Sequence, residues 1–211
     1  MIFQLLFPPK CVLCRKLLTH NETDLCHTCR KNAPEFIKAK NNIPFVAGWT
    51  ALWYYKDMVR ASLIRYKFRN ARSYGEVYGK LLAMKLQDTS VDFVTWVPVS
   101  RLRRWTRGYD QVQLIAQPTA KHLGLPLCAT LKKLRHTRPQ SGLNDISKRR
   151  ANVLGVYAVI CPEEIAGKRI LLLDDIVTTG ATASECARVL LTAGAESVHL
   201  AAVAATTHDK K

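Results

Sequence analysis

The sequence predicts an α/β fold, a mostly parallel sheet flanked by helices, with a small N-terminal zinc module built on four cysteines. From Phe93 onward, short apolar runs alternate with stretches of helical periodicity, which is the pattern of an α/β domain. Residues 170–173 are four consecutive aliphatic side chains, as in a strand buried on both faces. Two Cys-x-x-Cys pairs within the first 42 residues indicate the appended module.

Composition narrows the class of protein. The 211 residues suffice for one domain with a real core and a small extra module. A hydrophobic content of 48% and dispersed charges exclude a disordered chain. The net charge of +16 predicts attraction to phosphates on nucleic acid or on an anionic small molecule, and less so to an acidic membrane surface.

The sequence also indicates where the protein resides. No apolar run approaches the roughly 18 residues of a membrane helix, so we expect no membrane insertion. The N-terminus lacks the basic segment of a signal peptide, and seven cysteines, four of them paired as Cys-x-x-Cys, suit metal thiolates in a reducing compartment. We therefore expect a cytoplasmic protein.

The first 42 residues are expected to fold around a metal, because they have too few periodic apolar positions for a core of their own. Cys11 and Cys14 form one knuckle, and Cys26 and Cys29 form a second after eleven intervening residues. Four thiolates in this spacing predict a structural zinc site. Redox pairs, an iron-sulfur cluster or free thiols are the alternatives, and His27 is expected to face solvent rather than bind the metal.

The rest of the chain, residues 43–211, is predicted to form one domain. Aromatic and apolar residues over 43–55 suggest a pair of strands around Gly48. Apolar spacing predicts amphipathic helices from about 59 to 68 and 77 to 86, and later from 109 to 123 and 180 to 193. Strands are predicted over the following ranges: 93–98, 127–134, 153–159, 169–174 and 197–204.

The most informative segment is the strand, turn and helix of residues 170–182. Asp174 and Asp175 follow the aliphatic run, where ligands bind in parallel sheets. The next residues offer backbone N–H groups, small hydroxyls and a helix N-terminus, which together suit a phosphate: Thr178, Thr179, Gly180, Ala181 and Thr182. Two carboxylates repel a bare phosphate, so we expect a sugar phosphate whose ribose hydroxyls donate to the acids.

These residues resemble the phosphoribosyl pyrophosphate (PRPP) binding signature of type I phosphoribosyltransferases, and every position of the thirteen-residue pattern fits. The simpler interpretation, an Asp or Thr capping a helix, explains one polar residue but not the whole run. The segment 75–81 contains two glycines and a lysine, but it is one residue shorter than a P-loop and lacks the Ser/Thr of that motif. It is therefore expected to lie in a surface helix.

Basic loops are expected to close the site. The segment Val97-Pro98-Val99-Ser100, followed by Arg101, is similar to the loop that grips the diphosphate in type I enzymes, which implies a pyrophosphate site at Val99, Ser100 and Arg101. Residues 139–143, between basic stretches, resemble the mobile catalytic loop of those enzymes. A second interpretation is nucleic-acid binding through stacking and phosphate contacts by Arg103, Arg104, Trp105, Arg107, Arg149 and Arg150. For any single arginine, the alternative is that it is a solvated surface charge with no binding role.

The paired knuckles, Lys67-Phe68, residues 97–100, 107–111, Pro139-Gln140, Arg149-x-x-Asn152 and the PRPP signature together resemble the ComF/GntX family over nearly the whole chain. Tyr109 and Asp110 depart mildly from that family, where Phe and Asn are more usual. The resemblance implies a type I phosphoribosyltransferase-like domain, a role in competence and DNA uptake, and PRPP bound with Mg2+.

Two functions from different classes follow. In the first, a phosphoribosyltransferase displaces pyrophosphate at ribose C1, with Asp174, Asp175 and Arg101 in catalytic roles and electrostatic positioning as the main effect. Its acceptor is unidentified, and a hood over it has to come from residues 43–90. In the second, a non-catalytic accessory uses the fold to sense a ligand and contacts single-stranded DNA or the uptake machinery. Whether the protein is an enzyme, and its oligomeric state, stay open.

Overall fold

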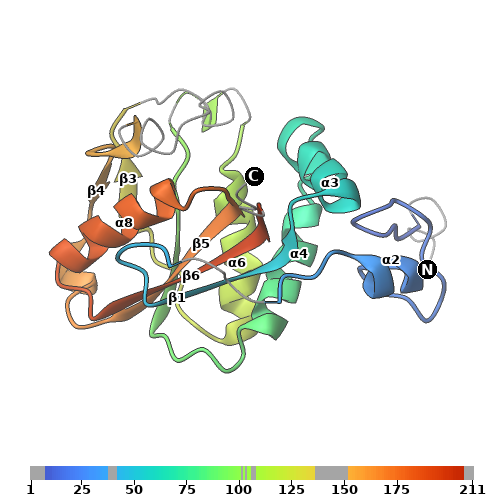
Figure 1. Cartoon of the computed structure of the whole chain (residues 1–211), viewed down its shortest axis with the longest axis horizontal. Helices are drawn as coiled ribbons and strands as arrows, with labels where there is room; N and C mark the ends of the chain where they lie inside the picture. Colours follow the sequence, from blue (N-terminus) through green and yellow to red (C-terminus); the bar gives the residue numbers. More distant parts are fainter. Residues whose placement is uncertain are drawn as a thin grey trace.

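A computed structural model describes residues 8–37, 42–100, 102, 104–105, 108–135 and 152–206. Its main sheet is parallel, with strand order β1-β6-β5-β2 (Figure 1). The strands are β1 (Gly48–Tyr54), β2 (Phe93–Trp96), β5 (Arg169–Val177) and β6 (Ser197–Ala205). A separate antiparallel pair is formed by β3 (Leu131–Lys133) and β4 (Tyr157–Val159). The predicted parallel α/β sheet is confirmed.

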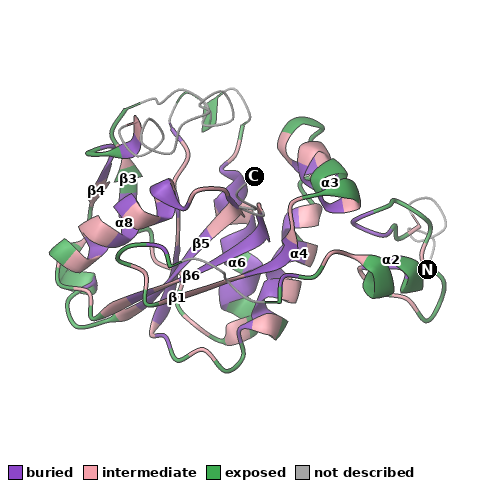
Figure 2. Ribbon diagram, viewed as in Figure 1, coloured by how far each residue is buried: buried purple, intermediate pink, exposed green. Residues whose placement is uncertain are grey.

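Helices cover both faces of the sheet. The helices are α2 (His27–Asn32), α3 (Asp57–Phe68), α4 (Tyr74–Lys85), α6 (Gln111–Leu123) and α8 (Ala181–Thr192), with a short 3-10 turn at Pro162–Glu164. Successive side chains of β5 point to opposite faces of the sheet, and both faces are apolar. Leu171 and Leu173 belong to the cluster under α3, α4 and α6, whereas Ile170 and Leu172 belong to the cluster under α8. All four are fully buried, and Figure 2 shows the purple interior of the sheet.

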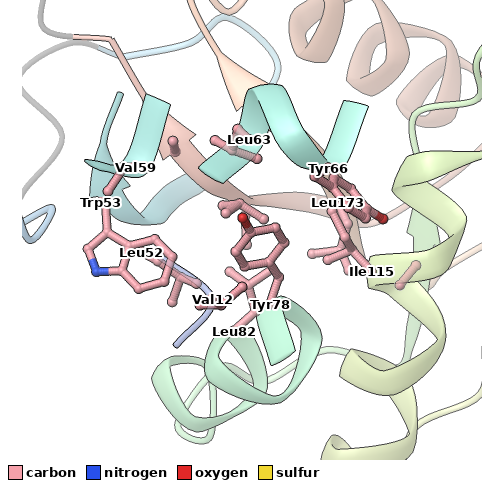
Figure 3. Packing of buried hydrophobic residues seen from close by; sticks show 14 of the residues in the cluster. Val12, Leu52, Trp53, Val59, Leu63, Tyr66, Tyr78, Leu82, Ile115 and Leu173 are labelled. Atoms are coloured by element: carbon pink, nitrogen blue, oxygen red, sulfur yellow. The ribbon is translucent and has the colours of Figure 1, made fainter. Parts of the chain in front are cut away.

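The apolar cluster under α3, α4 and α6 includes part of the cysteine-rich N-terminal segment. Val12 packs with residues of α3 and α4 such as Leu63, Tyr78 and Leu82 (Figure 3). Leu13 belongs to the same cluster, and both residues are 1% exposed. Burying a large apolar side chain stabilises by about 1.5–3 kcal/mol, so these contacts hold the N-terminal segment firmly against the helices.

Three of the segments predicted as strands differ most from the structure. The pair around Gly48 is wrong: only β1 forms, because Phe45 has φ 66° and the chain turns there before Ala47 pairs with β6. Residues 153–159 contribute a strand only from Tyr157, after a helical turn. Of 127–134, Leu127 bridges to Val94 of β2 and the strand itself starts at Leu131.

Helix α4 is not the surface helix that its sequence suggested. Gly75 and Gly79 are buried where α4 crosses α6, and a Cβ on Gly79 would lie 2.4 Å from Pro118 Cγ. The glycines therefore allow the two helices to approach closely, which is a packing role. Among the described residues, no helix is long and apolar enough to cross a membrane.

Candidate ribose-phosphate site and cysteine cluster

The acid pair lies at the carboxyl edge of the sheet. The strand extends beyond the predicted end at 174, because β5 keeps pairing with β6 as far as Val177. Pairing with β2, in contrast, stops at Leu173, whose carbonyl accepts the last bond from the Val97 N–H (2.9 Å). From Asp174 onward, the β2 side of β5 is therefore free of a strand neighbour.

The threonine loop forms a hollow beside these acids. The hollow is shallow and open to solvent, and it is lined by Asp174, Ile176, Val177, Thr178, Gly180, Ala181, Thr182 and Ala183. Gly180 has φ 74°, a conformation that glycine adopts without strain, and a Cβ there would lie 2.8 Å from Ile43. Thr179 Oγ1 accepts from the Ala181 N–H at 3.4 Å. The N-terminus of α8 thus opens toward the hollow, where its dipole favours an anion.

A lysine that the acid-pair motif did not reveal contacts the second acid. Lys67, near the end of α3, places its Nζ 2.8 Å from Asp175 Oδ2, with both side chains largely buried. The only sequence signal for Lys67 was its place in the family set of motifs. This ion pair supplies a positive charge beside two carboxylates.

Asp174 lies where a negative charge is unfavourable. Burial, then the nearby charge of Asp175, raise the pKa of Asp174 from 3.8 to about 7. The N–H of Asp175, which donates to Asp174 Oδ1 at 2.8 Å, and the charges of Lys67 and Lys133 partly oppose this shift. The acid pair by itself therefore resists two full negative charges, which favours a ligand that brings hydrogen-bond donors or a cation.

The loop after β2 is tied to the site through Asp110. Its carboxylate caps α6 by accepting from the N–H groups of Val112 and Gln113, and it also accepts from the Val99 N–H at 3.1 Å. Burial raises the pKa of Asp110. Ser100 is 3% exposed at the same edge of the sheet. The structure therefore brings Val99 and Ser100 to the carboxyl edge that also carries Asp174.

The predicted basic residues are only partly described. Trp105 is 83% exposed and Arg104 is exposed beside it, beyond β2. Several predicted site residues lie outside the described residues, as do residues 139–143: Arg101, Arg103, Arg107, Arg149 and Arg150. Within the 107–111 motif, Tyr109 and Gln111 bind the end of α3, which is a structural role.

The four cysteines of the two knuckles converge. Their sulfur atoms all lie within 4.8 Å of one another, and Cys14 and Cys26 Sγ are 3.6 Å apart. A tetrahedral zinc with Zn–S bonds of about 2.3 Å needs sulfurs about 3.8 Å apart, so the set fits structural zinc. Burial and neighbouring sulfurs raise the pKa of Cys29, so a cation is needed for all four to ionise together. His27 is exposed, as expected.

Family models match both parts of the chain. One described as Phosphoribosyl transferase domain matches residues 114–211, and one described as Double zinc ribbon domain matches residues 2–41. The glutamine phosphoribosylpyrophosphate (PRPP) amidotransferase from B. subtilis is a similar solved structure, at 23% identity and a TM-score of 0.46, over 66% of this chain and 30% of that one.

Two curated proteins resemble the chain over nearly their whole length. Competence protein F of Haemophilus influenzae is 25% identical, covering 90% of this chain and 94% of that protein. DNA utilization protein YhgH of Salmonella typhi is 26% identical, covering 92% and 95%. The chain therefore contains matches to a zinc ribbon and a phosphoribosyl transferase domain, and it is similar over nearly its whole length to proteins named for competence and DNA utilization.

Proposed function

Since this chain belongs to the ComF/GntX family, with a double zinc ribbon and a phosphoribosyl transferase domain, we propose that it binds PRPP with Mg2+ at the carboxyl edge of β5. The observation that carries the proposal is the adjacency of the acid pair to the hollow of the threonine loop. In this arrangement the ribose 2′ and 3′ hydroxyls donate to Asp174 and Asp175, and the 5′-phosphate is held by residues 178–182.

The remaining parts of the ligand have assigned partners. The pyrophosphate lies against Val99, Ser100 and Arg101. The Val99 N–H is held by Asp110, so the donors to the pyrophosphate oxygens are the backbone N–H groups that follow it and the guanidinium of Arg101. Mg2+ prefers carboxylate and phosphate oxygens, so the edge beside Asp174 and the diphosphate suits it, and the ion offsets negative charge when bound. Lys67 balances the charge of Asp175 through their ion pair. If transfer occurs, these groups act by orientation and charge stabilisation and exclude water at ribose C1.

Calorimetric titration of Mg–PRPP tests the site directly. The double variant Asp174→Asn, Asp175→Asn removes two negative charges, so an anion held by positive charge alone would bind it more tightly. Recognition of the ribose hydroxyls predicts the opposite, a loss of binding. Asp92→Asn is the matched control, since Asp92 pairs with Arg169 at the far end of β5. No binding by the wild type, or tighter binding by the double variant, would refute the proposal.

We propose that the protein acts in the cytoplasm, as its cysteine usage suggests, and that it takes part in the handling of DNA during competence or DNA utilization, the roles that give its relatives their names. Single-stranded DNA is the second candidate ligand, supported by the exposed Trp105 beside Arg104 and by the net charge of +16. Binding that weakens steeply with salt, quenches Trp105 fluorescence and persists in the double Asp variant would favour this non-catalytic role. Mg–PRPP binding followed by pyrophosphate release with a base would favour a transferase.

A further inference from the structure

Helix α3 links the first cysteine knuckle to the acid pair. Figure 1 shows α3 between the N-terminal segment and the carboxyl edge of the sheet. Two side chains of its second and third turns contact the knuckle, and its penultimate residue contacts Asp175. The helix therefore spans two parts of the molecule that no sequence motif connects.

The knuckle end of α3 is held by backbone carbonyls of the residues between Cys11 and Cys14. The Ser62 hydroxyl donates to the Val12 carbonyl, and Arg65 Nη2 donates to the carbonyls of Val12 and Leu13. Tyr78 shares a hydrogen bond with Ser62 at 2.7 Å. These carbonyls are positioned by the metal-binding knuckle itself, so α3 is docked on the zinc ribbon rather than on a flexible tail.

The site end of α3 is held just as closely. Gln111 Nε2 donates to the Lys67 carbonyl at 3.1 Å, and the buried Tyr66 hydroxyl donates to the Gln111 carbonyl at 2.6 Å. Arg65 and Lys67 are two residues apart, about 3 Å along the helix axis. The Arg65 contacts with the knuckle and the Lys67 contact with Asp175 therefore constrain the same turn of α3.

A second contact between ribbon and domain does not lead to the site. Lys80 of α4 pairs with Asp24 of the ribbon, with Nζ 2.6 Å from Oδ2. Lys80 lies on the helix packed against α6, and its side chain has no contact with the acid pair among the described residues. This pair provides a matched control for the loss of a ribbon contact in general.

We infer that the zinc ribbon positions the PRPP site: the first knuckle holds α3 through Ser62 and Arg65, and α3 thereby holds Lys67 at Asp175. Lys67 is then a ligand-site residue, and Ser62 and Arg65 are positioning residues that act through it. The inference rests on the proposed function only where ligand affinity is the readout.

A double-mutant cycle of Lys67 and Arg65 tests this link in the zinc-loaded protein. We expect Lys67→Met to weaken Mg–PRPP binding about tenfold, and Arg65→Met about fivefold with its zinc retained. In the Lys67→Met background, Arg65→Met should have no further effect. Lys80→Met should leave the affinity unchanged.

A ligand-free readout separates this inference from the proposed function. The side-chain ¹³Cγ shift of Asp175, measured at one fixed pH, reports the Lys67 contact. Lys67→Met and Arg65→Met should move it in the same direction, whereas Lys80→Met should not. The inference would be overturned if the affinity losses of Lys67→Met and Arg65→Met multiplied in the double variant. It would also be overturned if Lys80→Met had an equal effect, or if Arg65→Met left the Asp175 signal unmoved. Absent PRPP binding with a shifted Asp175 signal would refute the proposed ligand and retain the link.

Discussion

Replacing Asp174 with asparagine should stabilise the protein at alkaline pH. Burial and the charge of Asp175 raise the pKa of Asp174 from 3.8 to about 7. Between these values the native chain keeps a proton that the unfolded chain has released. The free energy of unfolding of the wild type therefore falls as the pH rises through this window, and it stops falling on this account above the folded pKa. Asparagine carries no such charge at any pH.

The size of the effect follows from the shift. Each pKa unit corresponds to about 1.4 kcal/mol, so the shift of roughly three units sets an upper limit of about 4 kcal/mol. Asp174 borders the open hollow, where water solvates the ionised carboxylate, so the measured value should lie below that limit. The part that titrates between about pH 5.5 and 8.5 amounts to at most about 2 kcal/mol. The amide oxygen still accepts from the Asp175 N–H, which keeps the local backbone in place.

Urea unfolding of the wild type and of Asp174→Asn at both pH values measures this difference. Metal effects on the ribbon cancel, because both proteins carry the same cysteines. Asp92→Asn is the control: hydrogen bonds from Arg169 hold the pKa of Asp92 at about 2, so its difference from the wild type should be the same at both pH values. A stability gain for Asp174→Asn that does not grow with pH, or a loss at pH 8.5, would refute the reasoning.

Three further substitutions have defined outcomes. Gly180→Ala forces a left-handed alanine against Ile43, so we expect a loss of about 2–3 kcal/mol in thermal unfolding and of Mg–PRPP binding in calorimetry; an unchanged melting temperature contradicts this. Gly79→Ala places a Cβ on Pro118 and should cost about 3 kcal/mol or more in urea unfolding, and a cost below about 1 kcal/mol would show that α4 and α6 separate easily. Cys29→Ser should lose bound zinc by metal analysis while Cys128→Ser retains it; equal zinc contents would place the metal elsewhere.

The segment from β5 to α8 could be predicted from sequence because its signals are local. Four consecutive aliphatic residues predict a strand buried on both faces, and the structure buries them under two separate layers of helices. Asp174, Asp175 and residues 178–182 are neighbours in the chain, so their proximity needs no tertiary information. The two knuckles are predictable for the same reason, since metal geometry constrains their spacing.

Lys67 could not be predicted to reach Asp175, because its helix periodicity says which face is apolar and not where the helix docks. The docking depends on contacts between residues far apart in sequence, such as the hydrogen bond from Tyr66 to Gln111. Similarly, the composition of residues 43–55 suits strands throughout, and only the left-handed Phe45 shows that the chain turns there. Such features arise from long-range packing and single backbone angles.

The shared core determines how the ribbon should be studied. Val12 and Leu13 complete the cluster that contains Leu63, Tyr78 and Leu82, so deleting residues 1–42 would expose that cluster to water. The boundary at residue 42 stays a prediction, and a deletion there would confound loss of folding with loss of the ligand site. Substitutions that leave all four cysteines and the apolar contacts intact, such as Arg65→Met, separate the two. If α3 transmits the position of the knuckle, ligand affinity changes in such variants while the protein stays folded and its zinc content stays close to that of the wild type.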